Sequence, residues 1–272
     1  MTTNFTLRTG DHGADVTVLQ QRLHRVGHPV VIDGWYGPTT EAAVRAFQRS
    51  RHLIEDGIAG PRTQSALLGT VDPRALTQAD IERAAAELGC EGAAINAVVE
   101  VESPRTGYLP DGRVVILFER HVFWRQLQAH GIDPTTVQAP VSILSQARGG
   151  YVGGVAEYAR LAQAAAIAQE PAMEACSWGR FQIMGHHARA LRYASATAMA
   201  AAFAAGEAEQ LQAFVRFVEN DAELFKALRN RKWAAFARSY NGPGYADNLY
   251  DVKLAKAYAR HAAARPSVSE MA

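Results

Sequence analysis

The strongest constraint on the fold of this chain is an eight-residue motif that occurs twice near the N-terminus. Residues 33–40 read DGWYGPTT and residues 56–63 read DGIAGPRT, so both follow the pattern D-G-x-x-G-P-x-T. An internal repeat of this kind indicates that one small structural unit is used twice. The glycines favour tight turns because they tolerate a positive φ, and we expect Thr40 and Thr63 to cap the helices that follow.

Apolar residues at helical spacing flank the two motifs. Leu19 and Leu23 lie on one stripe before the first motif, and Val44 and Phe47 lie on another between the motifs. A third short helix is expected at residues 64–68, after the second motif. Three short helices joined by two glycine turns make a compact unit of about 65 residues, with these four side chains in its core.

The spacing of these residues resembles that of a known domain. The residues that carry the resemblance are Asp15, Val16, Leu19, Gln20, Leu23, Gly27, Asp33, Gly34, Tyr36, Gly37, Thr40, Ala43, Val44, Phe47, Gln48, Asp56, Gly57, Gly60 and Thr63. Together they resemble the common peptidoglycan-binding domain of cell-wall hydrolases. The resemblance implies a binding domain, which we assign to residues 1–70. Exposed groups near the turns would contact the polymer, and Trp35, Tyr36 and Gln48 are the candidates.

Bulk composition limits the remaining choices. The 272 residues suffice for two domains with buried cores, and the formal net charge of +1 provides no strong field for nucleic acid. The two cysteines, Cys90 and Cys176, cannot form a disulfide framework, and no His/Cys cluster has the spacing of a zinc site. We therefore expect no nucleic-acid partner, no metal and no cofactor, while the role of the two thiols stays open.

The rest of the chain reads as a second, mainly helical domain. We assign residues 71–76 to a linker, 77–264 to this domain and 265–272 to a tail. Thr77 and Asp80 have the spacing of a capping box at the start of a helix. A turn at 110–112 precedes an apolar run at 114–118, which predicts a short buried strand. Further helices are expected at residues 93–102, 155–169, 185–205, 206–228, 232–239 and 247–264.

Four segments of this second domain carry a further resemblance. The sequence has Glu102-Ser103 at a helix end, ILFERHVF at 116–123, SWGRFQIMG at 177–185 and SYNGPGY at 239–245. The order of the first, third and fourth segments resembles that in lysozyme-like muramidases and in soluble lytic transglycosylases. The stretch from Glu102 to Phe123 resembles one family more closely, the N-acetylmuramidase domain of phage endolysins from Gram-negative hosts, and this resemblance covers about residues 76–260. Such a domain is usually found behind an N-terminal peptidoglycan-binding module. The implied fold class is mainly α, with a small three-helix binding domain followed by an α-rich lysozyme-like domain containing one small β element.

The resemblance implies roles for individual residues. Glu102 matches the catalytic general acid, and Tyr240 with Asn241 matches the segment that lines the floor of the cleft. Gln182 matches a residue near the N-acetyl group. From the same segment, Ser177 and Trp178 are further candidates for substrate binding, the tryptophan by stacking on a sugar.

The surroundings of Glu102 fit a proton donor. Glycoside cleavage needs a carboxylic acid that is still protonated near neutral pH, which an apolar setting favours by raising its pKa. Glu102 ends an apolar helix, and Ser103-Pro104 stops that helix. Glu100 is two residues away and would face elsewhere on the helix.

Glu119 is the candidate second carboxylate. It follows the apolar run 114–118, where an unpaired buried charge would be costly. It could orient a water or hold the environment of Glu102 through hydrogen bonds, and a structural ion pair with Arg120, Arg125 or Arg180 is the competing interpretation.

The resemblance also suggests where such a protein works. The N-terminal residues lack the pattern of a secretory signal, and the longest charge-free run, residues 193–206, falls short of the about 20 residues that span a bilayer. We expect synthesis in the host cytoplasm, no stable membrane insertion, action on the wall in the periplasm, dependence on a holin and a monomeric state.

Competing functions remain open on the sequence. A zinc amidase or peptidase often carries the same binding module, but the chain has no H-E-x-x-H motif. A pure binding protein would not need the combination of Glu102, Gln182 and Tyr240. A lytic transglycosylase uses the same acid and differs in that the 6-hydroxyl of the sugar, rather than water, completes the reaction. The second acid favours a hydrolase that cuts between N-acetylmuramic acid and N-acetylglucosamine.

Overall fold

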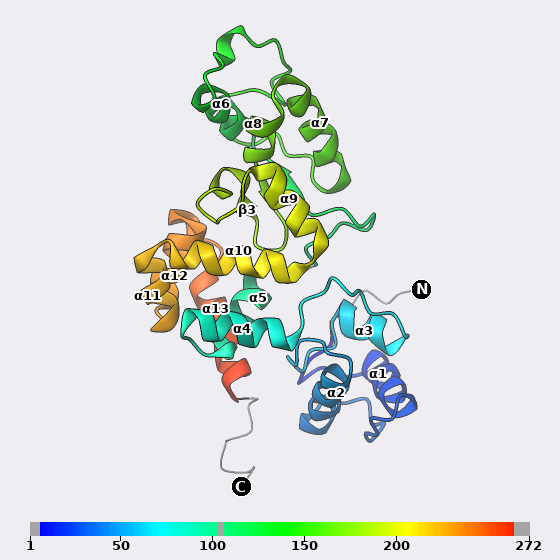
Figure 1. Ribbon diagram of the computed structural model, residues 1–272. Coiled ribbons are helices and arrows are strands. Elements are labelled where there is room, and N and C mark those ends of the chain that lie inside the picture. The colour runs from blue at the N-terminus through cyan, green and yellow to red at the C-terminus, as the bar shows by residue number, and fades with distance from the viewer. Residues whose placement is uncertain (1–5, 103–105, 264–272) are drawn as a thin grey trace. The chain divides into compact units, whose positions relative to one another are not determined.

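The computed structural model describes residues 6–102 and 106–263, and its chain divides into two compact units, Met1–Arg83 and Ala84–Ala272 (Figure 1). Helices dominate both units, and the second contains a small three-stranded sheet. The predicted fold class is therefore confirmed. The division falls within a helix that begins at Gln78. The finer boundaries at 70, 76 and 264 stay a prediction.

The first unit is built on three helices, α1 (Ala14–Arg25), α2 (Pro38–Ser50) and α3 (Pro61–Leu67). Their apolar faces meet in one core. The predicted core residues are all buried there: Leu19, Leu23, Val44 and Phe47.

The two motifs begin their helices at proline rather than at threonine. Pro38 and Pro61 are the first helical residues, where a missing N–H is harmless, and the glycines before them are the N-caps. Thr40 and Thr63 lie inside the first turn with their side chains buried. The prediction that these two threonines cap the helices is wrong.

Each motif instead folds around a buried glutamine from the preceding helix. Gln20 Nε2 donates to Asp33 Oδ1 (2.8 Å), Trp35 O (3.1 Å) and Thr40 Oγ1 (3.1 Å). Gln48 Nε2 repeats the pattern in the second motif and donates to Asp56 Oδ1 at 2.7 Å. The repeat is therefore one of hydrogen bonding as well as of sequence, and it explains why both copies keep Asp and Thr.

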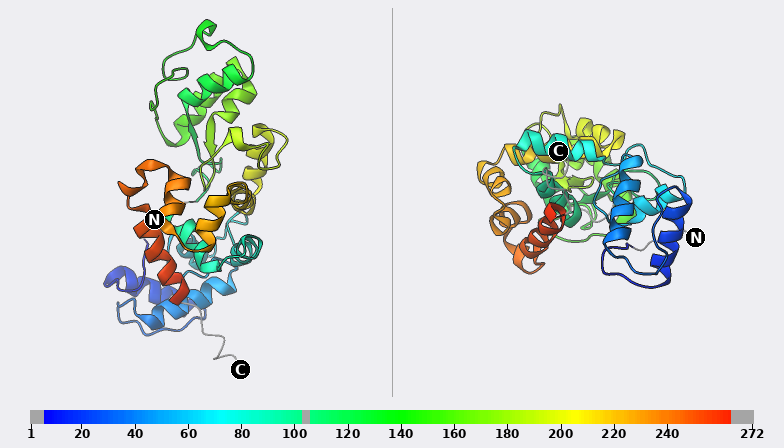
Figure 2. Two further views of the ribbon diagram at one scale, coloured as in Figure 1. Left: turned by 90° about the vertical axis from the view of Figure 1, so that its left-hand side faces the viewer. Right: turned by 90° about the horizontal axis from the view of Figure 1, so that it is seen from below.

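The second unit is made of short helices around the sheet. In chain order they are α4 (Gln78–Leu88), α5 (Gly92–Glu102), α6 (Arg120–Ala129), η1 (Pro134–Thr136), η2 (Gly154–Ala156), α7 (Glu157–Ile167), α8 (Gln169–Glu174), η3 (Gly185–His187), α9 (Ala196–Ala205), α10 (Glu207–Glu219), α11 (Ala222–Arg229), α12 (Trp233–Asn241), η4 (Pro243–Ala246) and α13 (Tyr250–Ala263). Two views place α6, α7 and α8 on one side of the sheet and α11, α12 and α13 on the other (Figures 1 and 2).

Local signals located several of these helices and missed others. Thr77 and Asp80 form the predicted capping box, with Thr77 N donating to Asp80 Oδ2 at 3.0 Å and Asp80 N to Thr77 Oγ1 at 3.3 Å. The helix α6 was not predicted. The expected helix at 185–205 is shorter, because its first part is a 3-10 turn and a bend, and α9 begins only at Ala196 behind the N-cap Ser195.

The sheet has the order β1–β2–β3, from β1 (Ile116–Phe118), β2 (Cys176–Trp178) and β3 (Ile183–Met184). Both pairs are antiparallel, with Leu117 opposite Ser177 and Ser177 opposite Met184. The predicted strand at 114–118 is confirmed, although the three-residue pairing is shorter than the apolar run.

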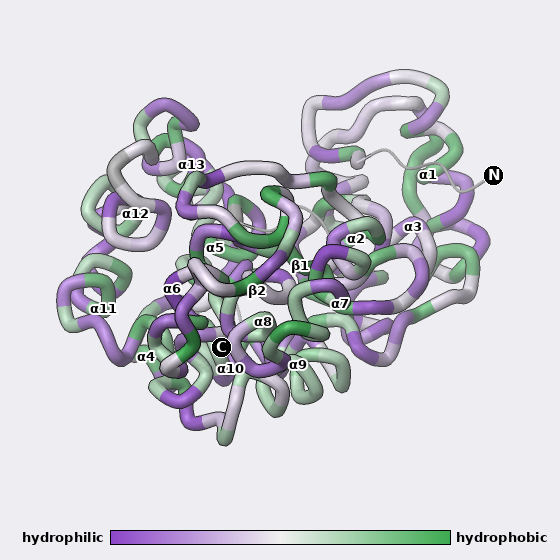
Figure 3. Tube along the Cα trace, turned by 90° about the horizontal axis from the view of Figure 1, so that it is seen from above, coloured by the Kyte–Doolittle hydropathy of each residue, from purple (hydrophilic) through white to green (hydrophobic). Residues whose placement is uncertain are grey.

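No helix among the described residues is long and apolar enough to cross a membrane. The most apolar-looking stretch, the alanine-rich α9, is ten residues long and mostly pale green in the hydropathy-coloured trace (Figure 3).

Candidate active site

The two faces of the small sheet differ in chemistry. Ile116 and Phe118 share one face with their partners Trp178 and Cys176, and all four are buried. The opposite face carries Leu117, Ser177 and Met184, because side chains alternate along a strand.

Glu119 extends this second face. Its backbone is extended (φ −103°, ψ 95°), and its N–H donates to Ala175 O at 3.0 Å, so the ladder continues by one residue. Glu119 and Leu117 are two residues apart and therefore point the same way. We call the side chains of Leu117, Glu119, Ser177, Gln182 and Met184 the polar face of the sheet.

Gln182 closes the turn between β2 and β3. Its Oε1 accepts a hydrogen bond from Ser177 Oγ (2.7 Å), and its Nε2 donates to Gly179 O (2.8 Å). Its φ of 49° is left-handed, which is uncommon for a residue other than glycine. The side chain is exposed, so an amide of fixed orientation stands at the surface above a buried Ser177. This arrangement suits contact with a polar group such as an N-acetyl, and both substrate contacts stay predictions.

Trp178 is not available to a sugar. Its side chain is 3% exposed, on the apolar face of the sheet, and its Nε1 donates to Met173 O at 3.0 Å. The prediction that Trp178 stacks on substrate is wrong, because the alternation of the strand turns it into the core while Ser177 faces the other way.

Tyr240 is fixed against the β2–β3 turn. Its hydroxyl donates to Phe181 O at 2.9 Å, and its ring stacks on Phe236 with 5.6 Å between centroids. Phe214 meets the same ring edge-on at 5.6 Å. Asn241 follows as the last residue of α12, which ends at Gly242 with a φ of 82°. The structure thus brings Tyr240 and the Gln182 turn together, as the predicted site requires.

Glu102 is the last residue of α5, as predicted, but its side chain and Ser103 lie outside the described residues. The backbone still limits where it is. Gly107 lies beside the sheet, since its carbonyl accepts from Val115 N at 2.9 Å. Five residues of chain reach at most about 18 Å. The Cα of Glu102 is therefore within that distance of Gly107 at the start of the sheet.

The partners of Glu119 are a tyrosine and a histidine. Tyr151 donates its hydroxyl to both carboxylate oxygens (3.0 and 2.8 Å), and His121 Nδ1 lies 3.2 Å from Oε2. The competing interpretation, an ion pair with Arg120, Arg125 or Arg180, is not what the structure has. Arg120 donates to backbone carbonyls and Arg180 pairs with Glu207. Burial lowers the pKa of His121, which favours its neutral form beside the carboxylate.

A buried ion pair near Glu119 leaves no local signal in the sequence. Glu157 is fully buried and accepts from Phe118 N (3.2 Å), Val152 N (2.8 Å), Gly153 N (2.9 Å) and Arg160 Nη1 (2.7 Å). Burial alone would raise the pKa of Glu157, but these hydrogen bonds outweigh it and hold the pKa below its usual range. The pair therefore fixes the end of β1, and with it the backbone that carries Glu119.

A second buried carboxylate ties together the segments around the sheet. Glu207 accepts from Thr106 Oγ1 (3.2 Å) and Gly107 N (2.7 Å), and its other oxygen meets Arg180 Nη1 at 3.2 Å. It thereby joins the segment after α5 to the β2–β3 turn. Gln210 adds a hydrogen bond to the same turn, because its Oε1 accepts from the backbone N–H of Arg180 (2.6 Å). No local motif in the sequence marks either residue.

The candidates for wall binding in the first unit separate into one exposed and two buried residues. Trp35 is 48% exposed and lies over Gly37, with its ring stacked on His12. Tyr36 is fully buried and donates its hydroxyl to Gly57 O at 2.7 Å. Gln48 is 1% exposed. The prediction that Tyr36 and Gln48 are exposed binding groups is wrong, since both are structural. Trp35 stays a candidate.

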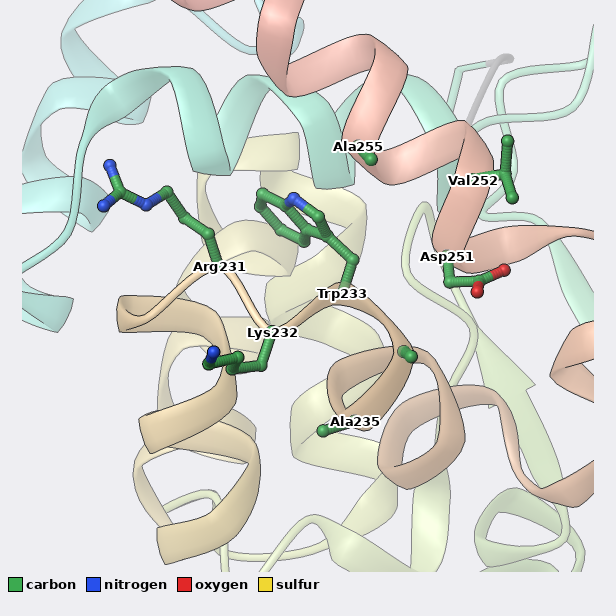
Figure 4. A pocket seen from close by; sticks show the side chains of 8 residues that line it. Arg231, Lys232, Trp233, Ala235, Asp251, Val252 and Ala255 are labelled. Atoms are coloured by element: carbon green, nitrogen blue, oxygen red, sulfur yellow. The ribbon is translucent and has the colours of Figure 1, made fainter.

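Other features of the second unit lie apart from the predicted residues. One pocket of about 600 Å³ lies between α12 and α13, with Trp233 and Ala255 in its wall, Arg231 and Lys232 toward one end and Asp251 toward the other (Figure 4). None of the predicted site residues lines it. Cys90 and Cys176 are free thiols. Within residues 6–102 and 106–263, no group of three or more His, Cys, Asp or Glu could hold a metal ion.

Comparison with known proteins shows which families the two units resemble. The N-acetylmuramidase family matches residues 91–262. The chain belongs to this family. The peptidoglycan binding domain family matches residues 12–67. The crystal structure of a Burkholderia AP3 phage endolysin superposes with a TM-score of 0.90 and 52% identity, over 95% of this chain and 98% of that one.

Part of the chain also resembles part of a different enzyme. The zinc D-Ala-D-Ala carboxypeptidase of Streptomyces albus G is 46% identical over 63 residues, which make up 21% of this chain and 24% of the carboxypeptidase. The chain thus spans about a quarter of that relative. The predicted combination of a peptidoglycan-binding domain with a muramidase domain is confirmed, and the chain is a glycoside hydrolase of the cell wall.

Proposed function

We propose that the chain is an endolysin that hydrolyses the β-1,4 bond between N-acetylmuramic acid and N-acetylglucosamine and so leads to lysis of the host cell. The observation that carries this proposal is the polar face of the sheet, where Glu119 and the Ser177–Gln182 pair point the same way in a unit of the N-acetylmuramidase family. The apolar face behind it holds the sheet in the core.

Glu102 is the proton donor in this proposal. Its carboxyl protonates the glycosidic oxygen as the bond to the anomeric carbon breaks, and the sugar passes through an oxocarbenium-like state. Water then adds to the anomeric carbon and loses its proton to a base. Gln182, with its amide fixed by Ser177 and Gly179, orients the N-acetyl group.

Glu119 is proposed as the second carboxylate. The one hydroxyl proton of Tyr151, shared between both oxygens, and one contact with His121 leave Glu119 further acceptor capacity, because an ionised carboxylate offers about four lone-pair sites. With its side chain 15% exposed, Glu119 is accessible to solvent. A carboxylate that positions water favours hydrolysis over the transglycosylase alternative, in which the 6-hydroxyl of the sugar attacks.

The first unit would act as the anchor. Residues 1–70 would hold the enzyme on the insoluble wall through Trp35, so that repeated cuts in one polymer become a local search. Dependence on a holin, a monomeric state and action in the periplasm are further hypotheses of the same proposal.

The test is the variant Glu102→Gln, which keeps the shape of the side chain but cannot donate the proton. We expect lysis of outer-membrane-stripped cells to fall at least ~100-fold, with wall binding and Tm unchanged. The matched control is Glu91→Gln, which changes an exposed carboxylate that pairs with Arg231 just before α5. A Glu102→Gln enzyme that keeps more than a tenth of the activity would overturn the assignment.

Product analysis separates hydrolase from transglycosylase. Mass spectrometry of digested peptidoglycan should find reducing-end muramic acid. The 1,6-anhydro form as the main product would replace the hydrolase by the transglycosylase.

A further inference from the structure

We propose that Tyr151 is a sugar-binding platform, on which a ring of the peptidoglycan glycan strand stacks beside the reacting bond. The inference rests on the proposed function and adds a subsite to it. Tyr151 is 47% exposed, although its hydroxyl is held by both oxygens of Glu119. An aromatic side chain with a fixed hydroxyl and an open ring is arranged to present that ring to a ligand.

The loop that carries Tyr151 is held in place from three sides. Arg120 donates to Ala147 O (2.9 Å) and Arg148 O (2.8 Å) before the tyrosine. After it, the amides of Val152 and Gly153 donate to the buried Glu157. Glu119 holds the tyrosine itself. An exposed loop with so many bonds to its backbone keeps the ring in one position before any ligand arrives, which reduces the entropy lost on binding.

The backbone of this loop needs its glycines. Gly149, Gly150, Gly153 and Gly154 have φ values of 86°, 82°, 72° and 57°, a region that other residues rarely adopt. A side chain at Gly150 would also lie 3.2 Å from Arg120 Nη1. The glycines at residues 149–154 therefore allow one specific backbone conformation, and this conformation exposes the ring of Tyr151.

The position of Tyr151 relative to the sheet identifies its occupant. Glu119, which accepts the hydroxyl of Tyr151, lies on the polar face two residues after Leu117, the partner of Ser177. Two residues of strand advance ~7 Å, which is comparable to the step from one sugar to its neighbour in a polymer. A glycan strand bound at Gln182 would thus place a neighbouring sugar at Tyr151. Stacking on the apolar face of a pyranose suits an open phenol ring and needs no charge.

The hydrogen bond from Tyr151 to Glu119 also connects the platform to the proposed mechanism. Burial and the bond to Glu119 raise the pKa of Tyr151, so the phenol stays protonated and keeps donating to the carboxylate. A strand seated on the ring would therefore be held at a fixed offset from the second carboxylate of the proposed mechanism.

Kinetics on soluble glycan strands of graded length test the proposal with the full chain. For Tyr151→Ala we expect KM on long strands to rise about 10-fold, equal to about 1.4 kcal/mol, with kcat changed much less. The shortest cleavable strands, which end before the platform, should lose less. Tyr151→Phe keeps the ring and should keep KM within about twofold, while any loss in kcat reports the missing bond to Glu119.

Two controls keep the outcome interpretable. Val252→Ala trims another exposed apolar side chain, on α13, and should leave both constants unchanged. The Tm of Tyr151→Ala should stay near that of the unchanged chain, because the loop keeps its bonds to Glu157 and Arg120. Equal KM for Tyr151→Ala and the unchanged chain at every length would overturn the platform alone. Full activity of Glu102→Gln would instead overturn the proposed function, so the two failures are distinguishable.

Discussion

Replacing Gln48 by alanine separates a structural residue from a binding residue in the first unit. Its Nε2 donates to Asp56 Oδ1 (2.7 Å), Ile58 O (3.1 Å) and Thr63 Oγ1 (3.1 Å), and its Oε1 accepts from Gly57 N (2.9 Å). The two N–H groups of the amide are shared among three acceptors, so the side chain makes about three full hydrogen bonds, and at about 1 kcal/mol each their removal suggests a loss of about 3 kcal/mol. A unit of this size has a total stability of only about 4–12 kcal/mol.

Such a loss should be visible in calorimetry of the full chain. A domain of 60–100 residues loses about 4–8 °C of Tm per kcal/mol, so the transition of the first unit should fall by at least about 12 °C. Gln20→Ala is the matched variant, because Gln20 makes the equivalent bonds in the first motif, and it should behave alike. Trp35→Ala removes an exposed ring and should leave this transition within a few degrees, while it weakens sedimentation with purified peptidoglycan.

The opposite pattern would refute the reasoning. If Gln48→Ala kept the transition of the first unit and lost wall binding, the glutamine would be a ligand-binding residue and the hydrogen-bond argument would be wrong. If Trp35→Ala left sedimentation unchanged, the wall contact would have to be sought elsewhere on the first unit.

Two further predictions concern the second unit. Glu157→Gln should lower its Tm by roughly 10 °C, since breaking a buried pair costs about 3–5 kcal/mol and leaves Arg160 without its counter-charge; a shift below about 3 °C would contradict this. Burial, aided by His186, lowers the pKa of His187 to about 4, so the folded state favours the neutral imidazole. The contribution of neutral His187 to the free energy of unfolding is therefore complete above about pH 6.5 and is lost as the pH falls toward 4. His187→Phe should keep the packing against Phe217 and flatten that part of the Tm-against-pH curve, and an unchanged curve would contradict the assignment.

The first unit shows what periodicity in a sequence can and cannot locate. Leu19, Leu23, Val44 and Phe47 were predicted as core because apolar spacing follows the geometry of the helix. Tyr36 and Gln48 were wrongly predicted as exposed, because a tyrosine and a glutamine near a turn both carry polar groups that usually face solvent. Each is buried because a specific partner satisfies it: a carbonyl for the tyrosine, and the whole second motif for the glutamine.

Long-range partners explain what the sequence did not reveal in the second unit. Glu157 lies 39 residues from Phe118, and Glu207 lies 100 residues from Gly107, so neither contact leaves a local pattern. The helix α6 was missed for a local reason. Glu119 is the N-cap residue of α6, but its side chain makes no capping hydrogen bond, so the start of this helix carries none of the usual capping residues.

The polar face, by contrast, can be predicted from the sequence once the register of β1 and β2 is known. The sequence of β1 is Ile, Leu, Phe and that of β2 is Cys, Ser, Trp, and successive side chains lie on opposite faces of the sheet. Pairing Leu117 with Ser177 places Trp178 on the apolar face and Ser177 on the opposite face, and shifting the register by one residue would reverse both. The correct register also sets Glu119 on the side of Gln182. The candidate chemistry of this enzyme therefore depends on one pairing between segments about 60 residues apart. The buried side chains fix the register of that pairing, and the register in turn sets the positions of the polar side chains.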